Sequence, residues 1–142
     1  MSRNEIIFEA VCNGNRDKAK DSVQSAVDDG TDVELLLTES MIPAMREIGD
    51  RFARNEAFIP QMLLAARAMQ EGLAIIEPLL IESGHEPRGK VAVGSVEGDL
   101  HDIGKNLVVM MLKGAGFEVD DLGVDCKVER FHKAVADGLT VI

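Results

Sequence analysis

Residues 91–124 read VAVGSVEGDLHDIGKNLVVMMLKGAGFEVDDLGV. The stretch opens with a short β-rich run and closes with a second one, 117–124, and the residues between them have helical character. A further helical segment, 127–138, is followed by the apolar residues 139–142, which resemble the start of a third strand. Alternation of strands and helices is typical of a parallel, Rossmann-like sheet with right-handed crossovers. A third strand without a covering helix would leave apolar surface open, so we expect this domain to be incomplete at its C-terminal side.

The first 83 residues have a different apolar period. Apolar side chains recur at helical spacing in four segments, which short connections would pack into an antiparallel bundle. We expect the first helix to end near Gly14 and the second at residues 28–30. Asp32 is placed to cap the third helix, which Pro43 should kink or break. Pro60 is placed in the first turn of the fourth helix.

The sequence therefore predicts an α plus α/β protein with two domains. The first is a four-helix bundle cap, residues 1–83. Residues 84–90, which contain two glycines and a proline, are the expected linker and hinge. The second is the truncated Rossmann-like parallel α/β domain, residues 91–142.

Composition narrows the possible partners of the chain. Its 142 residues carry a formal net charge of -10, without a lysine or arginine cluster. DNA or an anionic membrane surface would repel such a chain, so we expect neither nucleic acid nor membrane as a partner. A cytoplasmic location is expected because the chain has neither a long apolar run nor a signal-peptide pattern. The two cysteines, Cys12 and Cys126, are expected to be small buried hydrophobes rather than a disulfide.

The loop EGDLHDIG, residues 97–104, follows the first predicted strand directly. Ligands of open parallel sheets bind at that end of the strands. His101 can offer a ring nitrogen to a metal, and Asp99 can accept a hydrogen bond from the other nitrogen. Alternatively, Asp99 or Asp102 caps the following helix and His101 is an ordinary polar loop residue. The spacing by itself leaves both interpretations open.

A metal held by side chains alone would need more ligands than this loop supplies. The remaining candidate side chains, His85, His132, Cys12 and Cys126, are scattered along the sequence. A metal that a macrocycle already holds needs only one protein ligand.

Two motifs carry a specific resemblance. The pattern Asp99-x-His101-x-x-Gly104, within residues 96–125, closely resembles the cobalamin-binding motif of B12-dependent methyltransferase proteins. Residues 41–69, MIPAMREIGDRFARNEAFIPQMLLAARAM, resemble the helical bundle that precedes this motif in methionine synthase. The same bundle is found in the small corrinoid proteins of methylamine, methanol and betaine demethylation. The resemblance extends from about residue 3 to residue 142.

This resemblance implies a cofactor, cobalamin or a related corrinoid, and roles for particular residues. His101 would be the lower axial ligand of cobalt, and Asp99 would hydrogen-bond to it, so that these two are the catalytic residues. The upper face of the corrin would be covered by the bundle, although apolar residues at helical spacing are usually core. The residues expected along the lower face are Gly98, Leu100, Asp102, Ile103 and Gly104, and those expected in the cap are Phe52, Ile59 and Met62.

The function that the resemblance implies is methyl transport, with cobalt alternating between Co(I) and methyl-Co(III). The expected partners are a substrate-specific corrinoid methyltransferase, a second methyltransferase with a thiol or tetrahydrofolate as acceptor, and a reductive activase. The family's Ser-x-Leu and Gly-Gly stretches, which bury the nucleotide tail, do not occur before Ile142. We therefore expect residues 1–142 to contact the corrin ring but not to enclose the tail fully.

Three other functions share parts of this pattern. A B12-dependent transcriptional sensor would need a DNA-binding element, and no basic patch is present. A subunit of an adenosylcobalamin mutase would share the Asp-x-His loop but would not be expected to carry the helical bundle. A receiver-like binding module would bind no corrinoid at all.

Overall fold

The computed structural model describes residues 3–84 and 88–139, with the side chains of Ile103 and Leu107 left out. The chain divides into two compact units, residues 1–86 and 87–142, and each is described by itself. Residues 85–87 of the predicted linker and 140–142 of the predicted third strand lie outside the described residues.

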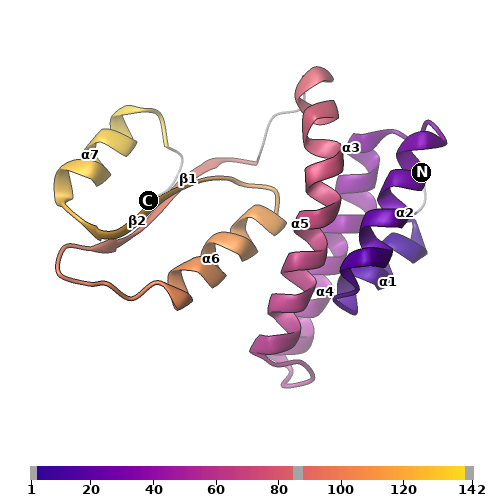
Figure 1. The fold of residues 1–142 in the computed structure, drawn as a ribbon, viewed down its shortest axis with the longest axis horizontal. Helices are drawn as coiled ribbons and strands as arrows, with labels where there is room; N and C mark the ends of the chain where they lie inside the picture. The colour runs from indigo at the N-terminus through magenta and orange to yellow at the C-terminus, as the bar shows by residue number, and fades with distance from the viewer. Residues whose placement is uncertain (1–2, 85–87, 140–142) are drawn as a thin grey trace. The chain divides into compact units, whose positions relative to one another are not determined.

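The first unit is the predicted helical bundle (Figure 1). Side-chain caps begin three of its helices: Asn4 accepts a hydrogen bond from the Ile7 N–H at 3.2 Å, Asn15 from Lys18 at 3.1 Å, and Asp32 caps as predicted. Its elements are α1 (Glu5–Cys12), α2 (Arg16–Asp28), α3 (Val33–Leu35), the π-helix η1 (Leu36–Met41), α4 (Ile42–Ala53) and α5 (Ile59–Glu82).

The third predicted helix is divided into α3, η1 and α4, which follow one another without a gap. The π-helix ends directly before the first turn of α4, which contains Pro43. Proline has no N–H and its ring crowds the carbonyl four residues earlier, and a wider turn accommodates both effects. Within η1 the Oγ of the fully buried Ser40 accepts the Asn4 N–H at 2.9 Å, which joins the π-helix to the start of α1.

The core of the bundle lies between α5 and the helices packed on it. At Gly72 of α5, an added Cβ would lie 2.7 Å from the Met41 Cε and 3.2 Å from the Val23 Cγ2, so glycine permits this close packing. Cys12 is buried and free, as is Cys126 of the second unit, and this confirms the expectation for both thiols. None of the helices within residues 3–84 and 88–139 combines the length and hydrophobicity needed to cross a membrane.

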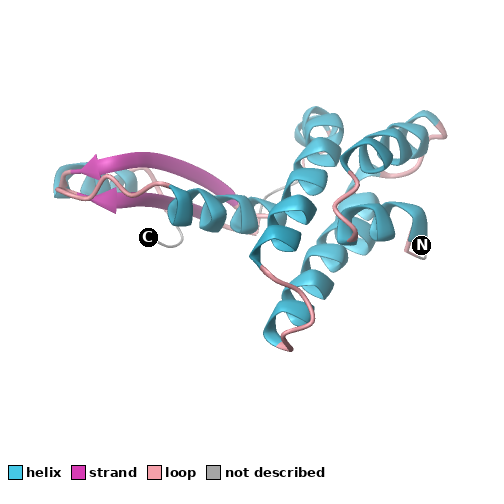
Figure 2. Cartoon of the chain, turned by 60° about the horizontal axis from the view of Figure 1, so that its bottom comes forward, coloured by secondary structure: helices cyan, strands magenta, loops and turns pink. Residues whose placement is uncertain are grey.

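Within residues 88–139, the second unit contains two parallel strands, β1 (Lys90–Val96) and β2 (Glu118–Cys126). They are joined by α6 (Ile103–Gly114), and α7 (Val128–Ala136) follows β2 (Figure 2). The predicted strand–helix–strand–helix order is confirmed, and β2 extends two residues beyond its predicted end. Pairing runs from Lys90 beside Glu118 to Val96 beside Cys126, with irregularities on both sides of Gly94.

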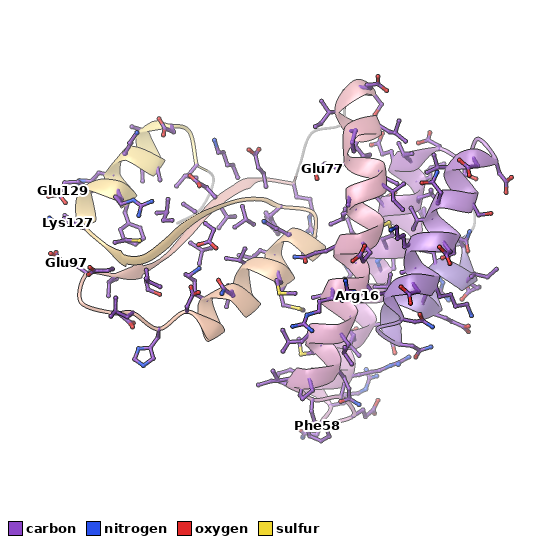
Figure 3. All side chains as sticks on the ribbon, in the orientation of Figure 1. Arg16, Phe58, Glu77, Glu97, Lys127 and Glu129 are labelled. Atoms are coloured by element: carbon purple, nitrogen blue, oxygen red, sulfur yellow. The ribbon has the colours of Figure 1, made fainter. Side chains whose placement is uncertain are left out.

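The two helices of this unit lie on opposite sides of the strand pair (Figure 1). On the α7 side, an added Cβ at Gly94 would lie 3.0 Å from the Cys126 Sγ and the Leu122 Cβ of β2 and 3.3 Å from the Phe131 Cζ of α7, so the sheet and helix approach closely there. Both strands end at the same edge, where Glu97 and Lys127 are found (Figure 3). Ala92, Leu122, Cys126 and Ala134 form the buried cluster under α7, with Phe131 and Leu139 packed against it.

Replacing Gly14 tests how the turn between α1 and α2 fits against α5. Gly14 has φ +68, and an added Cβ would lie 2.5 Å from the Leu64 Cβ. We expect Gly14→Ala to lower the free energy of unfolding by at least about 2 kcal/mol, because left-handed strain and overpacking add. Gly30→Ala is the matched control, with φ +79 and no atom within 4 Å of an added Cβ, and should cost only about 1 kcal/mol. Equal losses in urea unfolding would contradict this packing.

Candidate functional site

The loop between β1 and α6 presents one imidazole to solvent. The His101 side chain is 97% exposed, and its Nδ1 lies 2.6 Å from Oδ1 of Asp99. The same oxygen accepts the backbone N–H of His101 at 2.8 Å. Asp99 is therefore bound to His101 and does not cap α6. Since Nδ1 is occupied, Nε2 is the ring nitrogen left for an external ligand.

The negative charge of Asp99 favours the hydrogen bond between its carboxylate and Nδ1 of His101. The hydrogen bond from the His101 backbone N–H, followed by that from its ring, holds the pKa of the Asp99 carboxyl below its ordinary value. The carboxylate is therefore ionised at neutral pH and accepts a hydrogen bond from a protonated Nδ1. An Nδ1–H tautomer leaves the lone pair of Nε2 free, which is the form that binds metals.

Hydrogen bonds from both strands hold the loop in place. Ser95 of β1 donates from Oγ to the His101 carbonyl at 2.7 Å. At the end of β2, the Asp125 Oδ1 accepts the Gly98 N–H at 2.8 Å, and the Asp125 N–H donates to the Asp99 carbonyl at 3.0 Å. Gly98 has φ +88, a left-handed conformation that glycine adopts without strain.

An ion-pair cluster fixes the start of α6. The Lys105 side chain is 6% exposed, and its Nζ lies 2.7 Å from Oδ1 of Asp121 and 3.1 Å from Oδ1 of Asp102. Asp102 also accepts a hydrogen bond from the Asn106 amide at 3.0 Å. Asp102 occupies the N-cap position, but its side chain makes no capping hydrogen bond. The capping alternative is therefore confirmed for the position of Asp102 but not for a capping hydrogen bond from its side chain, and it is wrong for Asp99.

The remaining predicted loop residues belong to the same surface. Leu100 is 71% exposed, although it is apolar. Gly104 is exposed, and a Cβ added there would meet no atom within 4 Å. Ile103 begins α6, and its side chain lies outside the described part of the chain.

The predicted cap residues lie in the first unit, near the turn between α4 and α5. Phe52 is 43% and Ile59 50% exposed, so both are surface residues of the bundle, whereas Met62 is half-buried. Sequence reasoning missed Phe58, which is 61% exposed. Figure 3 shows Phe58 at the start of α5, pointing away from the bundle.

Sequence reasoning also missed the residues that support the loop: Ser95, Lys105, Asp121 and Asp125. One signal could have found the two aspartates, because they lie near the end of the second predicted strand. The carboxyl ends of parallel strands meet at one edge of a sheet, so acidic residues there should approach the loop after the first strand.

The donor set fits a metal that is held mainly by a macrocycle. No group of three or more His, Cys, Asp or Glu side chains within residues 3–84 and 88–139 is arranged to hold a bare metal ion. His132 is exposed on α7, and His85 lies outside the described residues. One oriented imidazole beside two glycines, on an open surface, suits a single axial bond to a planar group.

Comparison with protein families identifies the family of this chain. Residues 4–77 match a family described as a B12 binding domain, and residues 89–139 match a second family of the same description. This chain belongs to the B12-binding domains. Its cofactor is therefore cobalamin or a related corrinoid.

Two similar proteins of this B12-binding family are named as corrinoid proteins. A corrinoid protein of Desulfitobacterium hafniense is 37% identical over all of this chain and 68% of its own length. The trimethylamine corrinoid protein of Methanosarcina barkeri is 35% identical over 96% of this chain and 65% of its own length. The chain thus spans about two thirds of the length of these two relatives.

Solved structures resemble this B12-binding chain as well. A chain of the methanol:cobalamin methyltransferase complex from Methanosarcina barkeri has a TM-score of 0.81 and 31% identity, over 92% of this chain and 50% of that one. A cobalamin-binding protein from Desulfitobacterium hafniense has a TM-score of 0.72 and 28% identity, over 94% of this chain and 63% of that one.

Removing one partner of the Lys105 cluster should change the acid stability of the chain. The hydrogen bond from Lys105 holds the pKa of Asp121 below its ordinary value. The stabilisation is therefore complete above about pH 4 and is lost as the pH falls through the lowered pKa. We expect Asp121→Asn to reduce the free energy of unfolding by roughly 1 kcal/mol or less at pH 7, and by progressively less below pH ~4.

Urea unfolding between pH 3 and pH 7 measures this difference. Asp120→Asn is the matched control, since Asp120 is exposed on the same strand and carries the same charge. A pH-independent difference between the wild type and Asp121→Asn would contradict the assigned ion pair.

Proposed function

We propose that this chain binds its corrinoid through His101 and, within the whole protein, carries a methyl group between two methyltransferases. The first would be a substrate-specific corrinoid methyltransferase, and the second would use a thiol or tetrahydrofolate as the acceptor. One observation carries the proposal: a fully exposed imidazole whose Nδ1 is held at 2.6 Å by an ionised carboxylate. When bound, the corrinoid supplies a cobalt atom that can accept and release a methyl group.

His101 and Asp99 have separate tasks in this proposal. Nε2 of His101 would hold the cobalt of the corrinoid in place of the cofactor's own base. Asp99 holds the proton on Nδ1 and fixes the orientation of the ring, because one oxygen contacts both the ring and the backbone N–H of His101. Such a carboxylate raises the basicity of a ligating histidine.

The rest of the loop would line the lower face of the corrin. Gly98 and Gly104 have no side chain to keep a flat ring away, and Leu100 offers exposed apolar surface. Asp102 and Ile103 complete this surface at the start of α6. We assign these five residues to cofactor binding because they lie beside His101 on one edge of the unit.

The helical unit would cover the upper face. Phe52 and Ile59 expose apolar surface that a protein in water gains by burying, and Met62 lies one turn further along α5. An apolar cover excludes water from a reactive cobalt centre. The cover has to move when a partner enzyme delivers or takes the methyl group.

The names of two relatives support a methyltransferase partner. One is a trimethylamine corrinoid protein, and the other is part of a complex with methanol:cobalamin methyltransferase activity. We infer that the whole protein works with an enzyme of this kind, with an acceptor methyltransferase, and with a reductive activase that restores oxidised cobalt.

Electron paramagnetic resonance tests the role of His101. Bound to Co(II) cobalamin, the chain should show nitrogen splitting, because the unpaired electron of cobalt contacts the axial nitrogen. The pattern should change in protein labelled with 15N-histidine, and His101→Ala should abolish this isotope effect, because the cofactor's own base carries no label. His132→Ala is the matched control and should keep the isotope effect, since that residue is exposed on α7 and is not part of the loop.

Two outcomes would count against the proposal. Bound cobalamin without a histidine signal in the wild type would refute axial ligation by His101. Failure of the wild type to retain any corrinoid would refute binding by this chain.

The cap assignment is tested by removing an exposed phenyl ring. We expect Phe52→Ala to lower the affinity for cobalamin roughly tenfold, because apolar surface buried against the cofactor is lost. The free energy of unfolding should change by only about 0.5 kcal/mol, since the ring is partly exposed. Ile81→Ala removes a 73% exposed side chain from the last turn of α5 and is the matched control. Absorbance titrations that do not distinguish these variants would refute the cap.

A further inference from the structure

The loop that carries His101 depends on one residue of the neighbouring strand. Asp125 at the end of β2 accepts the Gly98 N–H through Oδ1 at 2.8 Å and donates its own N–H to the Asp99 carbonyl at 3.0 Å. These two bonds hold consecutive residues of the loop. The second ends on the residue whose side chain orients His101.

The backbone of Asp125 has an unusual conformation. Its φ is +52, and only one other described residue besides the glycines, Asn55, has a positive φ. This left-handed region is unfavourable for residues with a Cβ, although aspartate and asparagine tolerate it best. Strain of this kind persists where the surrounding structure requires it and is frequent at functional sites. Here it lets the side chain and the N–H of one residue serve the same loop.

We propose that Asp125 is a positioning residue for the axial histidine. It holds the backbone of Gly98 and Asp99 so that the Asp99 carboxylate stays on Nδ1 of His101. Asp125 acts through the backbones of Gly98 and Asp99, to which these two hydrogen bonds run. The inference rests on the proposed function of His101.

Two substitutions separate the hydrogen bond from the backbone conformation. Asp125→Asn keeps an acceptor oxygen and tolerates a positive φ, so it should preserve the clamp. Asp125→Gly adopts the same φ without strain but has no side-chain acceptor. Asp120→Gly is the matched control, because Asp120 is exposed on the same strand. Urea unfolding of each variant confirms that it is folded before it is compared.

The first readout needs no cofactor. In the chain without corrinoid, hydrogen exchange of the Gly98 amide should accelerate at least about fivefold in Asp125→Gly, the factor that one ordinary hydrogen bond represents. Asp125→Asn and Asp120→Gly should exchange at nearly the wild-type rate. Equal rates in the wild type and Asp125→Gly would show that Asp125 does not hold the loop, and would overturn the inference.

The second readout is the nitrogen splitting of bound Co(II) cobalamin. In Asp125→Gly the ratio of histidine-bound to histidine-free signal should fall roughly fivefold, and Asp125→Asn should restore it. An unchanged ratio in Asp125→Gly, with splitting present in the wild type, would overturn the inference and leave the proposed function intact. Absence of splitting in the wild type would instead overturn the role of His101, and the inference with it.

Discussion

The site depends on one constraint: an imidazole in full contact with water has to keep a single orientation and a single tautomer. A free surface histidine rotates and exchanges its ring proton, and ordering it costs conformational entropy. Asp99 removes that freedom because a single oxygen accepts both the ring and the backbone N–H of His101. The loop in turn needs supports, and these come from Ser95 on β1 and Asp125 on β2.

The strands supply these supports because they are parallel and end together. A parallel pair joined by α6 places the loop after β1 beside the end of β2. Three residues there, Gly98, Gly123 and Asp125, have left-handed backbones. Such conformations interrupt the regular hydrogen bonding of a strand. Their concentration at the carboxyl edge marks the place where the backbone follows the geometry of the loop instead of that of the strand.

The helical unit combines a packed core with exposed apolar side chains. Its core is tightly packed around Gly72 and the buried Met41. Phe52, Phe58 and Ile59 remain exposed near the turn between α4 and α5. Exposed apolar side chains gathered at one turn are typical of a surface that is covered when a ligand binds.

The sequence by itself determined the period of each segment, and with it the bundle, the strand–helix alternation and the Asp-x-His loop. These features depend on neighbours in the chain, so local spacing is enough to predict them. Only the tertiary structure decided that Asp99 binds His101 rather than capping α6, that Lys105 is buried between Asp102 and Asp121, and that Asp125 reaches Gly98 across 27 positions. The contacts of Asp121 and Asp125 depend on which residues of the two strands lie side by side, and the local pattern does not specify that register. The spacing of Asp99 and His101 left two interpretations open, and the observed hydrogen bond decides between them.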